Sequence, residues 1–420
     1  MTDQSPAQPE PDIIIGSREQ LLHLLAEASE IEHSLMCSYL YAAFSLKRAD
    51  HQDFSQEQGR AVERWRKAIM NVAIEEMGHL LMVANLTVAV GGRPHFARPN
   101  FPISPGYLPS GVVVRISGFS PETLDHFIFL ERPRGIEGND AADYDQGDYA
   151  RDQARPGIMP SAQDYETIGH LYDAIRKNLI ALAARLGEQD LFIGEGGAQL
   201  GADVVDLEGI TKITNLAEAH GAIDLIVEQG EGSPADREES HYRTFRAVRD
   251  ELQRLSDADP AFVPAWPVAD NPVLRQPPEP EDKVFIDNPA SARLLDFACA
   301  TYGLLLRVLG QSFARSGPHV QDDQQMLVKA SFTLMHVLGT TASDLAKLPA
   351  RKDQDGVHAG MSFTMLRGVE PLLGGPAEAR MIREQLAALA DASVPSGLTE
   401  RIKALSNDFR LASEQVPARN

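Results

Sequence analysis

A long helical segment of this chain carries a carboxylate and an imidazole at positions that should face a protein core. Between residues 69 and 90 the apolar residues recur in steps of three and four, as in a helix that buries one stripe. The stripe consists of Ile69, Val72, Val83, Leu86 and Val90. Glu76 and His79 fill the two positions between Val72 and Val83. A buried ionised carboxylate costs several kcal/mol unless it is paired, hydrogen-bonded or bound to metal, so the pattern predicts a polar centre inside a helical bundle.

An earlier stripe places a second carboxylate in the same core. Glu32 lies in line with apolar residues that follow the same alternation, namely Leu21, Leu25, Ala28, Leu35 and Tyr39. The first helix should begin after Ser17, a good N-cap with Gln20 three residues on, and run to about residue 48. The second should run from about residue 56 to 90 and end at Gly91. Two such helices are the usual opening of an antiparallel bundle.

These residues match part of a known metal-binding pattern. A four-helix di-metal site takes one Glu from each of two helices and a Glu-x-x-His pair from each of the other two. Glu32 supplies one part, and Glu76 with His79 supplies another. Glu75 lies about 100° around the helix from Glu76, so it is expected in solvent or supporting a ligand.

The remaining ligands are less well determined by the sequence. On a third helix, expected from about 163 to 186, both Glu166 and His170 are candidates. A fourth helix is expected from about 210 to 229, with helix resuming from about 236 to 255. Across that break, Glu228 with His241 is the preferred pair, and Glu238 with His241 is the second choice.

The whole chain is expected to be all-α with few short strands, one of them at residues 112–116. Residues 1–16 read as a disordered lead, and 17–258 as the metal-binding bundle with a loop insertion at 93–163, in which the segment 132–163 is a candidate lid. A proline-rich linker at 259–285 leads to a C-terminal helical region at 286–415. This region should cover the bundle or form a homodimer interface.

Composition limits the partners and the compartment. The 420 residues include 39 Lys plus Arg and 60 Asp plus Glu, so the net charge of −21 argues against nucleic-acid and anionic-membrane partners. Cys37 and Cys299 are too few for a disulfide framework or a multi-cysteine zinc site. With no signal-peptide pattern at the N-terminus, a cytoplasmic location is expected. No organic-cofactor motif is identified.

Four separated segments resemble a known family. They are residues 32–47, residues 75–94, residues 167–172, and residues 226–232 followed by 240–242. In this order they are similar to the ferritin-like domain of the iminophenyl-pyruvate dimer synthase family, over roughly residues 17 to 250. The resemblance implies a ferritin-like bundle with an iron site. Family members belong to bacterial pigment and alkaloid pathways, where one couples two imines derived from oxidised aromatic amino acids.

The resemblance also implies a ligand set: Glu32, Glu76, His79, a third-helix residue, Glu228 and His241. The family usually has Glu where this chain has His170, which leaves Glu166 as the alternative. Large relatives are also much longer than this chain.

The leading expectation is therefore a di-iron oxidoreductase of secondary metabolism that uses dioxygen or peroxide on a small, amino-acid-derived substrate. Glu76 and Glu228 would bridge two iron ions, and manganese is the alternative metal. No catalytic side chain is assigned. The rival expectations are a non-catalytic iron-binding protein and a manganese-catalase-like peroxide scavenger.

Overall fold

The computed structural model describes residues 13–104, 107–108, 112–133, 136, 140–142, 144, 165, 167–230, 240–278, 282–314, 319–354, 356–368 and 376–414. This part of the chain is mainly helical, with one pair of short strands, which confirms the expected all-α class. Of the expected lead, only residues 13–16 are described. Most of the candidate lid within 132–163 also falls outside the described residues.

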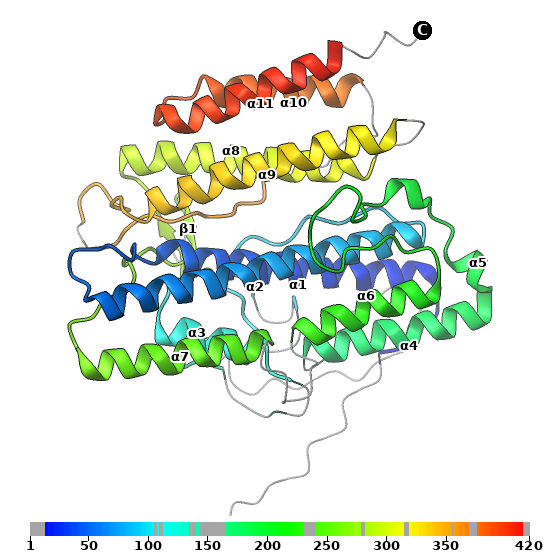
Figure 1. The fold of residues 1–420 in the computed structure, drawn as a ribbon, viewed down its shortest axis with the longest axis horizontal. Helices are drawn as coiled ribbons and strands as arrows, with labels where there is room; N and C mark the ends of the chain where they lie inside the picture. The colour runs from blue at the N-terminus through cyan, green and yellow to red at the C-terminus, as the bar shows by residue number, and fades with distance from the viewer. Residues whose placement is uncertain are drawn as a thin grey trace, which may run out of the picture.

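Two long helices form the middle layer of the molecule. They are α1 (Arg18–Ser45) and α2 (Gln56–Ala89), which pack side by side (Figure 1). The Ser17 hydroxyl caps α1 by accepting a hydrogen bond from the Gln20 backbone, and Ser55 with Gln58 forms a capping box on α2. Just beyond α2, Gly91 has φ +89°, which glycine adopts without strain. The predicted helix starts and the predicted stop at Gly91 are confirmed.

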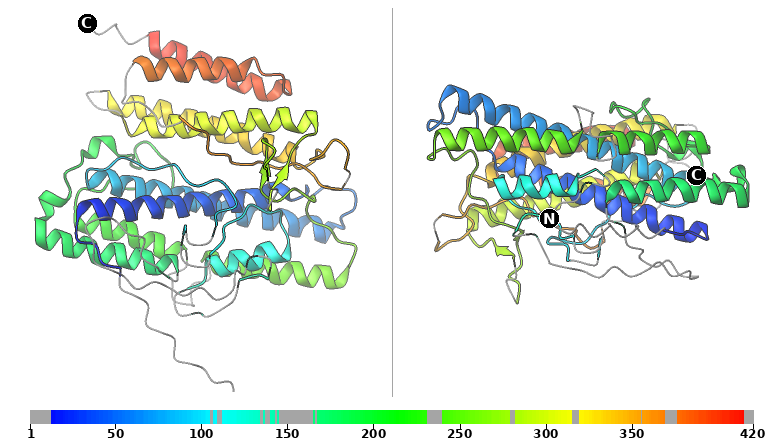
Figure 2. Two further views of the ribbon diagram at one scale, coloured as in Figure 1. Left: turned by 180° about the vertical axis from the view of Figure 1, so that it is seen from behind. Right: turned by 90° about the horizontal axis from the view of Figure 1, so that it is seen from below.

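Four shorter helices lie on one face of this pair (Figure 1). They are α3 (Pro121–Leu130), α4 (Ile168–Leu186), α6 (Leu216–Gln229) and α7 (His241–Ala258). They form two broken rods, α3 in line with α4 and α7 in line with α6 (Figure 2). α3 packs against α7, and α4 packs against α6, toward opposite ends of the long pair (Figure 2). The end of α3, the start of α4, the end of α6 and the start of α7 therefore meet near the middle of α1 and α2.

Three of these helices start later than the sequence predicts. Each begins directly after a polar residue whose side chain accepts a hydrogen bond from the helix backbone: Thr167 before α4, Asn215 before α6 and Ser240 before α7. Such caps satisfy backbone groups that have no partner within the helix, so they determine the first residue. α7 consequently begins at His241, rather than near residue 236.

The remaining elements in this part of the chain are short. They comprise α5 (Glu188–Leu191), the 3-10 helix η1 (Gly196–Ala198), and the parallel pair β1 (Pro272–Val273) and β2 (Val284–Phe285). The predicted strand at 112–116 is wrong: its only ladder contact in the described structure is an isolated antiparallel bridge between Val114 and Ile103. The segment around Ile103 pairs with the valine-rich run 112–116 at this one position, so the run forms no strand of a sheet.

The C-terminal region covers the other face of the long helices. α8 (Pro289–Ser312) and α9 (Val320–Leu345) form the next layer, and α10 (Pro376–Ala390) and α11 (Ser396–Glu414) the outer one (Figure 1). Tyr302 on α8 shares a hydrogen bond with His33 on α1, and Arg307 forms a partly buried ion pair with Glu378 on α10 at 2.7 Å. One buried hydrophobic cluster includes side chains from the bundle and from this region.

Among the described helices, α2 is the one that is long and apolar enough to cross a membrane. However, 83% of its apolar window is buried inside the protein. This burial is what a core helix of a bundle requires, and it accounts for the apolar composition of α2.

Candidate metal centre

Five ionisable side chains from four helices meet where the two rods are broken. Glu32 comes from the middle of α1, Glu76 and His79 from the middle of α2, Glu131 directly follows α3, and His241 is the first residue of α7. Each is at most 2% exposed. The N-terminal end of α7 carries a partial positive charge, which favours the carboxylates beside it.

The first of two clusters joins α1 to α2. Nδ1 of His79 lies 3.1 Å from Oε2 of Glu76 and 3.4 Å from Oε2 of Glu32. The helical spacing of three residues brings Glu76 and His79 together on one face, and the packing of α1 on α2 adds Glu32. The candidate ligand atoms of these three residues all lie within 4.8 Å of one another.

The second cluster shares Glu76 with the first. Nδ1 of His241 lies 2.9 Å from Oε1 of Glu76 and 3.6 Å from Oε2 of Glu131. The candidate ligand atoms of these three residues again lie within 4.8 Å of one another. Thus one oxygen of the Glu76 carboxylate faces each cluster, as a carboxylate that bridges two metal ions would.

Two partly exposed side chains hold the imidazoles in place. Nε2 of His79 lies 3.0 Å from Oε1 of Gln229, and Nε2 of His241 lies 2.7 Å from Oε2 of Glu75. Since both partners accept hydrogen bonds through oxygen, each imidazole is set to donate through Nε2 and to direct its Nδ1 at the cluster. Glu75 thus supports a candidate ligand, His241, from outside the cluster, which is one of the two roles expected for Glu75.

Two tyrosines orient the remaining carboxylates. The Tyr172 hydroxyl donates a hydrogen bond to Oε1 of Glu32, and the Tyr39 hydroxyl donates to Oε1 of Glu131. Burial, together with the adjacent carboxylate charges, raises the pKa of both phenols well above its usual value. Both tyrosines therefore stay protonated near neutral pH and act as hydrogen-bond donors.

Protons held by Glu32 and His79 offset the negative charge of the crowded carboxylates. Burial raises the pKa of Glu32 to about 8, and the charge of Glu76 adds to this shift. Burial also acts to raise the pKa of Glu76, but His79, Glu32 and His241 together lower it well below its usual value. Burial acts to lower the pKa of His79, and the two carboxylates raise it to about 10. Protons thus occupy positions where metal cations would balance the same charge.

The donor set fits metal ions. Metal–ligand bonds to carboxylate and imidazole are about 2.0–2.2 Å, so ligand atoms on opposite sides of one ion lie about 4.4 Å apart, comparable to the spacing in each cluster. Nδ1 of His241 is a buried nitrogen with no hydrogen-bond partner of its own, although two carboxylate oxygens lie nearby. Carboxylates with imidazoles suit iron and manganese.

Of the two third-helix candidates, His170 is the one that the structure describes. His170 is buried in the first turn of α4, but it belongs to neither three-residue group found among the described side chains. Glu166 and Glu238 lie outside the described residues. The four positions that the sequence and the clusters share are Glu32, Glu76, His79 and His241.

Glu228 requires a correction, because its side chain is exposed and belongs to neither cluster. α6 buries the face formed by Ala219, Ala222, Ile223 and Ile226. Gln229, three residues after Ile226, continues that face and reaches His79, whereas Glu228 lies about 200° around the helix from Ile226. The expectation of a bridging Glu228 therefore fails by one residue of helical register.

Glu131 was missed by the sequence interpretation, although a signal for it exists. Leu124 and Phe127 are buried on α3, and Glu131 follows Phe127 by four residues. This is the same spacing of apolar residues followed by a carboxylate that identified Glu76.

Two neighbouring residues on α6 offer a direct test of this register. Gln229→Leu should weaken metal binding about 10- to 100-fold, because His79 loses the acceptor that orients its ring. Glu228→Ala should leave metal affinity unchanged. Competition with a chromogenic chelator measures both. A loss of affinity in the Glu228 variant alone would restore the sequence-based assignment.

Comparison with known proteins agrees with this architecture. A family model described as Ferritin-like matches residues 25–250, which is more than half of the chain. Dichlorochromopyrrolate synthase of Lentzea aerocolonigenes is 29% identical over 396 residues, covering 84% of this chain and 36% of that protein. The 2-imino-3-(indol-3-yl)propanoate dimerase of Chromobacterium violaceum is 28% identical over 333 residues, covering 71% of this chain and 29% of that protein. The chain thus spans about a third of the length of these relatives.

A solved structure supports the fold alone. The crystal structure of a ferritin-like protein from Caulobacter vibrioides matches with a TM-score of 0.51 at 17% identity, over 80% of this chain and 98% of that chain. The resemblance expected from the four sequence segments is confirmed by the family model and by the two relatives. The chain belongs to the ferritin-like family.

Proposed function

We propose that this chain is a metal-dependent oxidative enzyme that acts on small, amino-acid-derived molecules with dioxygen or peroxide as the oxidant. The observation that carries the proposal is the position of Glu76, whose two carboxylate oxygens face two separate clusters. Such an arrangement suits two ions held by one shared carboxylate, with iron as the expected metal and manganese as the alternative.

The names of the relatives suggest the substrate class. One relative is named as a synthase and the other as a dimerase of an indolyl imino acid. For this chain we therefore propose the oxidative coupling of two imino acids derived from aromatic amino acids. Forming one carbon–carbon bond from two C–H bonds releases two electrons and two protons, which reduce one dioxygen molecule to hydrogen peroxide.

The protein supplies a rigid and largely dry setting. When bound, a pair of redox-active metal ions supplies electron exchange with the oxidant. Glu32, Glu131, His79 and His241 would be the ligands on either side of Glu76, each oriented by an outer hydrogen bond. A small cavity of about 30 Å³, which Leu130 and Arg132 line on either side of Glu131, is bounded mainly by apolar side chains, including Ile31 and Leu35 of α1, Val112 and Val114. This apolar wall excludes water from one side of the clusters.

The proposal is tested by loading the purified chain anaerobically with Fe(II) and then admitting oxygen. Imino acids are generated in place from L-tryptophan or L-phenylalanine by an amino-acid oxidase with catalase present, and products are read by mass spectrometry. We expect about two irons per chain, oxygen uptake above that of the oxidase and catalase alone, and a product of twice the monomer mass less two hydrogens.

Two other outcomes would contradict the proposal. Oxygen uptake without an organic substrate, with many irons retained per chain, would indicate iron storage. Rapid disproportionation of hydrogen peroxide by the manganese-loaded chain, assayed without added catalase and without coupling of imino acids, would indicate a peroxide scavenger. The Glu228→Ala variant is the matched control, since its exposed carboxylate lies outside both clusters.

A further inference from the structure

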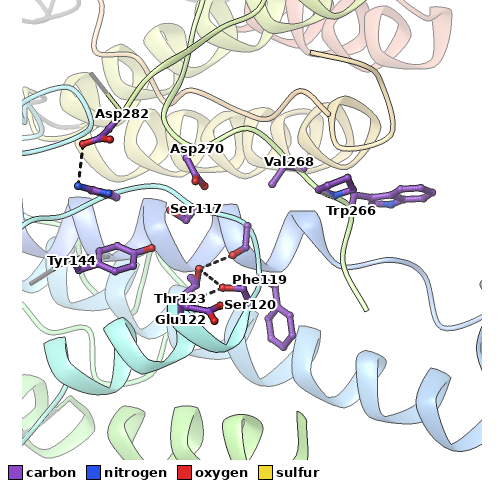
Figure 3. A pocket seen from close by; sticks show the side chains of 13 residues that line it. Ser117, Phe119, Ser120, Glu122, Thr123, Tyr144, Trp266, Val268, Asp270 and Asp282 are labelled. Atoms are coloured by element: carbon purple, nitrogen blue, oxygen red, sulfur yellow. Dashed lines mark hydrogen bonds and ion pairs between the residues drawn. The ribbon is translucent and has the colours of Figure 1, made fainter. Parts of the chain in front are cut away.

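A second cavity lies beside the start of α3, away from the clusters (Figure 3). Its volume is about 610 Å³, within the range of small-molecule sites. Ser120 caps the start of α3, whereas Glu131 follows its end, so the rise of a ten-residue helix places the cavity about 15 Å from the metal ligands. The cavity is therefore distinct from the candidate metal centre.

The floor of the cavity is built from buried hydroxyl groups. Tyr144 is 4% exposed and Ser117 is 9% exposed, and both line the cavity. The Tyr144 ring stacks on His126 with a centroid separation of 3.9 Å, which fixes the ring. Figure 3 shows the Tyr144 hydroxyl directed toward Ser117, with the Asp270 carboxylate beside Ser117. These oxygens converge from three separate segments of the chain.

The charge of the lining is negative. Among the described lining residues, Arg115 is the one cation, and its guanidinium lies 3.1 Å from Asp282. Two further carboxylates line the cavity, Glu122 in the first turn of α3 and Asp270. With three carboxylates against one guanidinium, the lining disfavours anions such as imino acids and favours a cation.

The geometry selects the kind of cation. Among the described residues, the groups close enough to hold a bare metal ion are the two clusters already described, and no carboxylate of this cavity belongs to them. An ammonium group, by contrast, has three donors and can reach acceptors several ångströms apart. We propose that this cavity binds a small organic ammonium ion, held by Asp270 and the hydroxyls of Tyr144 and Ser117, with Glu122 available to a second amine.

Three four-carbon compounds separate charge from shape in a direct test. Isothermal titration calorimetry on the full chain, at physiological ionic strength to screen distant charges, would compare 1,4-diaminobutane, 1,4-butanediol and succinate. We expect 1,4-diaminobutane to bind and the neutral and anionic compounds to bind about tenfold more weakly or not at all. Comparable binding of butanediol or succinate, or no binding of the diamine, would overturn the proposal.

Two variants assign the binding to this cavity. Asp270→Asn should weaken 1,4-diaminobutane binding about tenfold, because a charge-assisted hydrogen bond is lost. Asp322→Asn removes the same charge from an exposed position on α9 and should have no effect. Equal loss in both variants would show that only the overall acidity of the protein is sensed. Glu122→Gln is the second variant if Asp270→Asn does not fold, and metal content should be unchanged in all three.

Discussion

A Glu76→Ala variant should purify without metal, whereas the wild-type chain should hold about two ions. The reason is that Glu76 faces both clusters, so its removal takes one ligand from each. It also removes the carboxylate oxygens that lie nearest to Nδ1 of His79, at 3.1 Å, and to Nδ1 of His241, at 2.9 Å. The metal-free variant should therefore lose about 3–5 kcal/mol of unfolding free energy, as expected when one partner of a buried ion pair is removed.

Metal analysis by mass spectrometry and chemical denaturation measure these two effects. Glu76→Gln keeps the size and one acceptor oxygen, so it separates the loss of metal from the loss of fold: it should remain folded and still bind little metal. Glu228→Ala serves as the control with full metal content. If Glu76→Ala retained one ion per chain at full occupancy, the two clusters could not share this carboxylate, and the dinuclear assignment would be abandoned.

The sequence predicted the parts of the site that lie within continuous helices. Glu32, Glu76 and His79 sit in the middle of α1 and α2, where the apolar periodicity fixes which face is buried. The caps at Ser17 and Ser55 are local features of the sequence, so the helix starts were also predictable. When the two apolar stripes pack against each other, they bring Glu32 beside Glu76 and His79.

The parts that were missed lie at helix ends. Glu131 directly follows α3 and Gln229 ends α6, so both depend on where a helix stops. His241, which begins α7, was among the sequence candidates, although the start of α7 was expected near residue 236. One residue of register separates an exposed Glu228 from Gln229, which contacts His79. Helix ends are set by caps and by tertiary contacts between separate segments, and periodicity within one segment does not resolve them to a single residue.

The interruption of the rods also accounts for the composition of the site. With Glu32 on α1 and Glu76 with His79 on α2, the general pattern expects one Glu from a continuous third helix and one Glu-x-x-His pair from a continuous fourth. In this chain, the broken rods supply single residues at helix ends instead, Glu131 and His241, while Gln229 and Glu75 orient the imidazoles from outside. The site thus keeps the carboxylates and imidazoles of the pattern but draws them from different positions along the chain.

Replacing Glu131 should remove one metal ion and leave the other in place. Glu131 belongs only to the cluster with His241, while Glu32 belongs only to the cluster with His79. Glu131→Ala should therefore lower the metal content from about two ions per chain to about one. Glu32→Ala should do the same for the opposite ion, and the double variant should bind none. Anomalous diffraction from crystals loaded with iron would identify which position remains occupied in each variant.

The tyrosine partners provide the control for this experiment. Removing Glu131 also removes the acceptor of the Tyr39 hydroxyl, which is buried and would be left without its hydrogen bond. Glu131→Gln keeps an oxygen for Tyr39 and should still lose the ion, whereas Tyr39→Phe should keep both ions with a weaker affinity for one. Full metal content in Glu131→Ala would remove this residue from the ligand set. Loss of both ions would mean that the two positions fill only together, because the shared Glu76 carboxylate needs both cations to offset its burial.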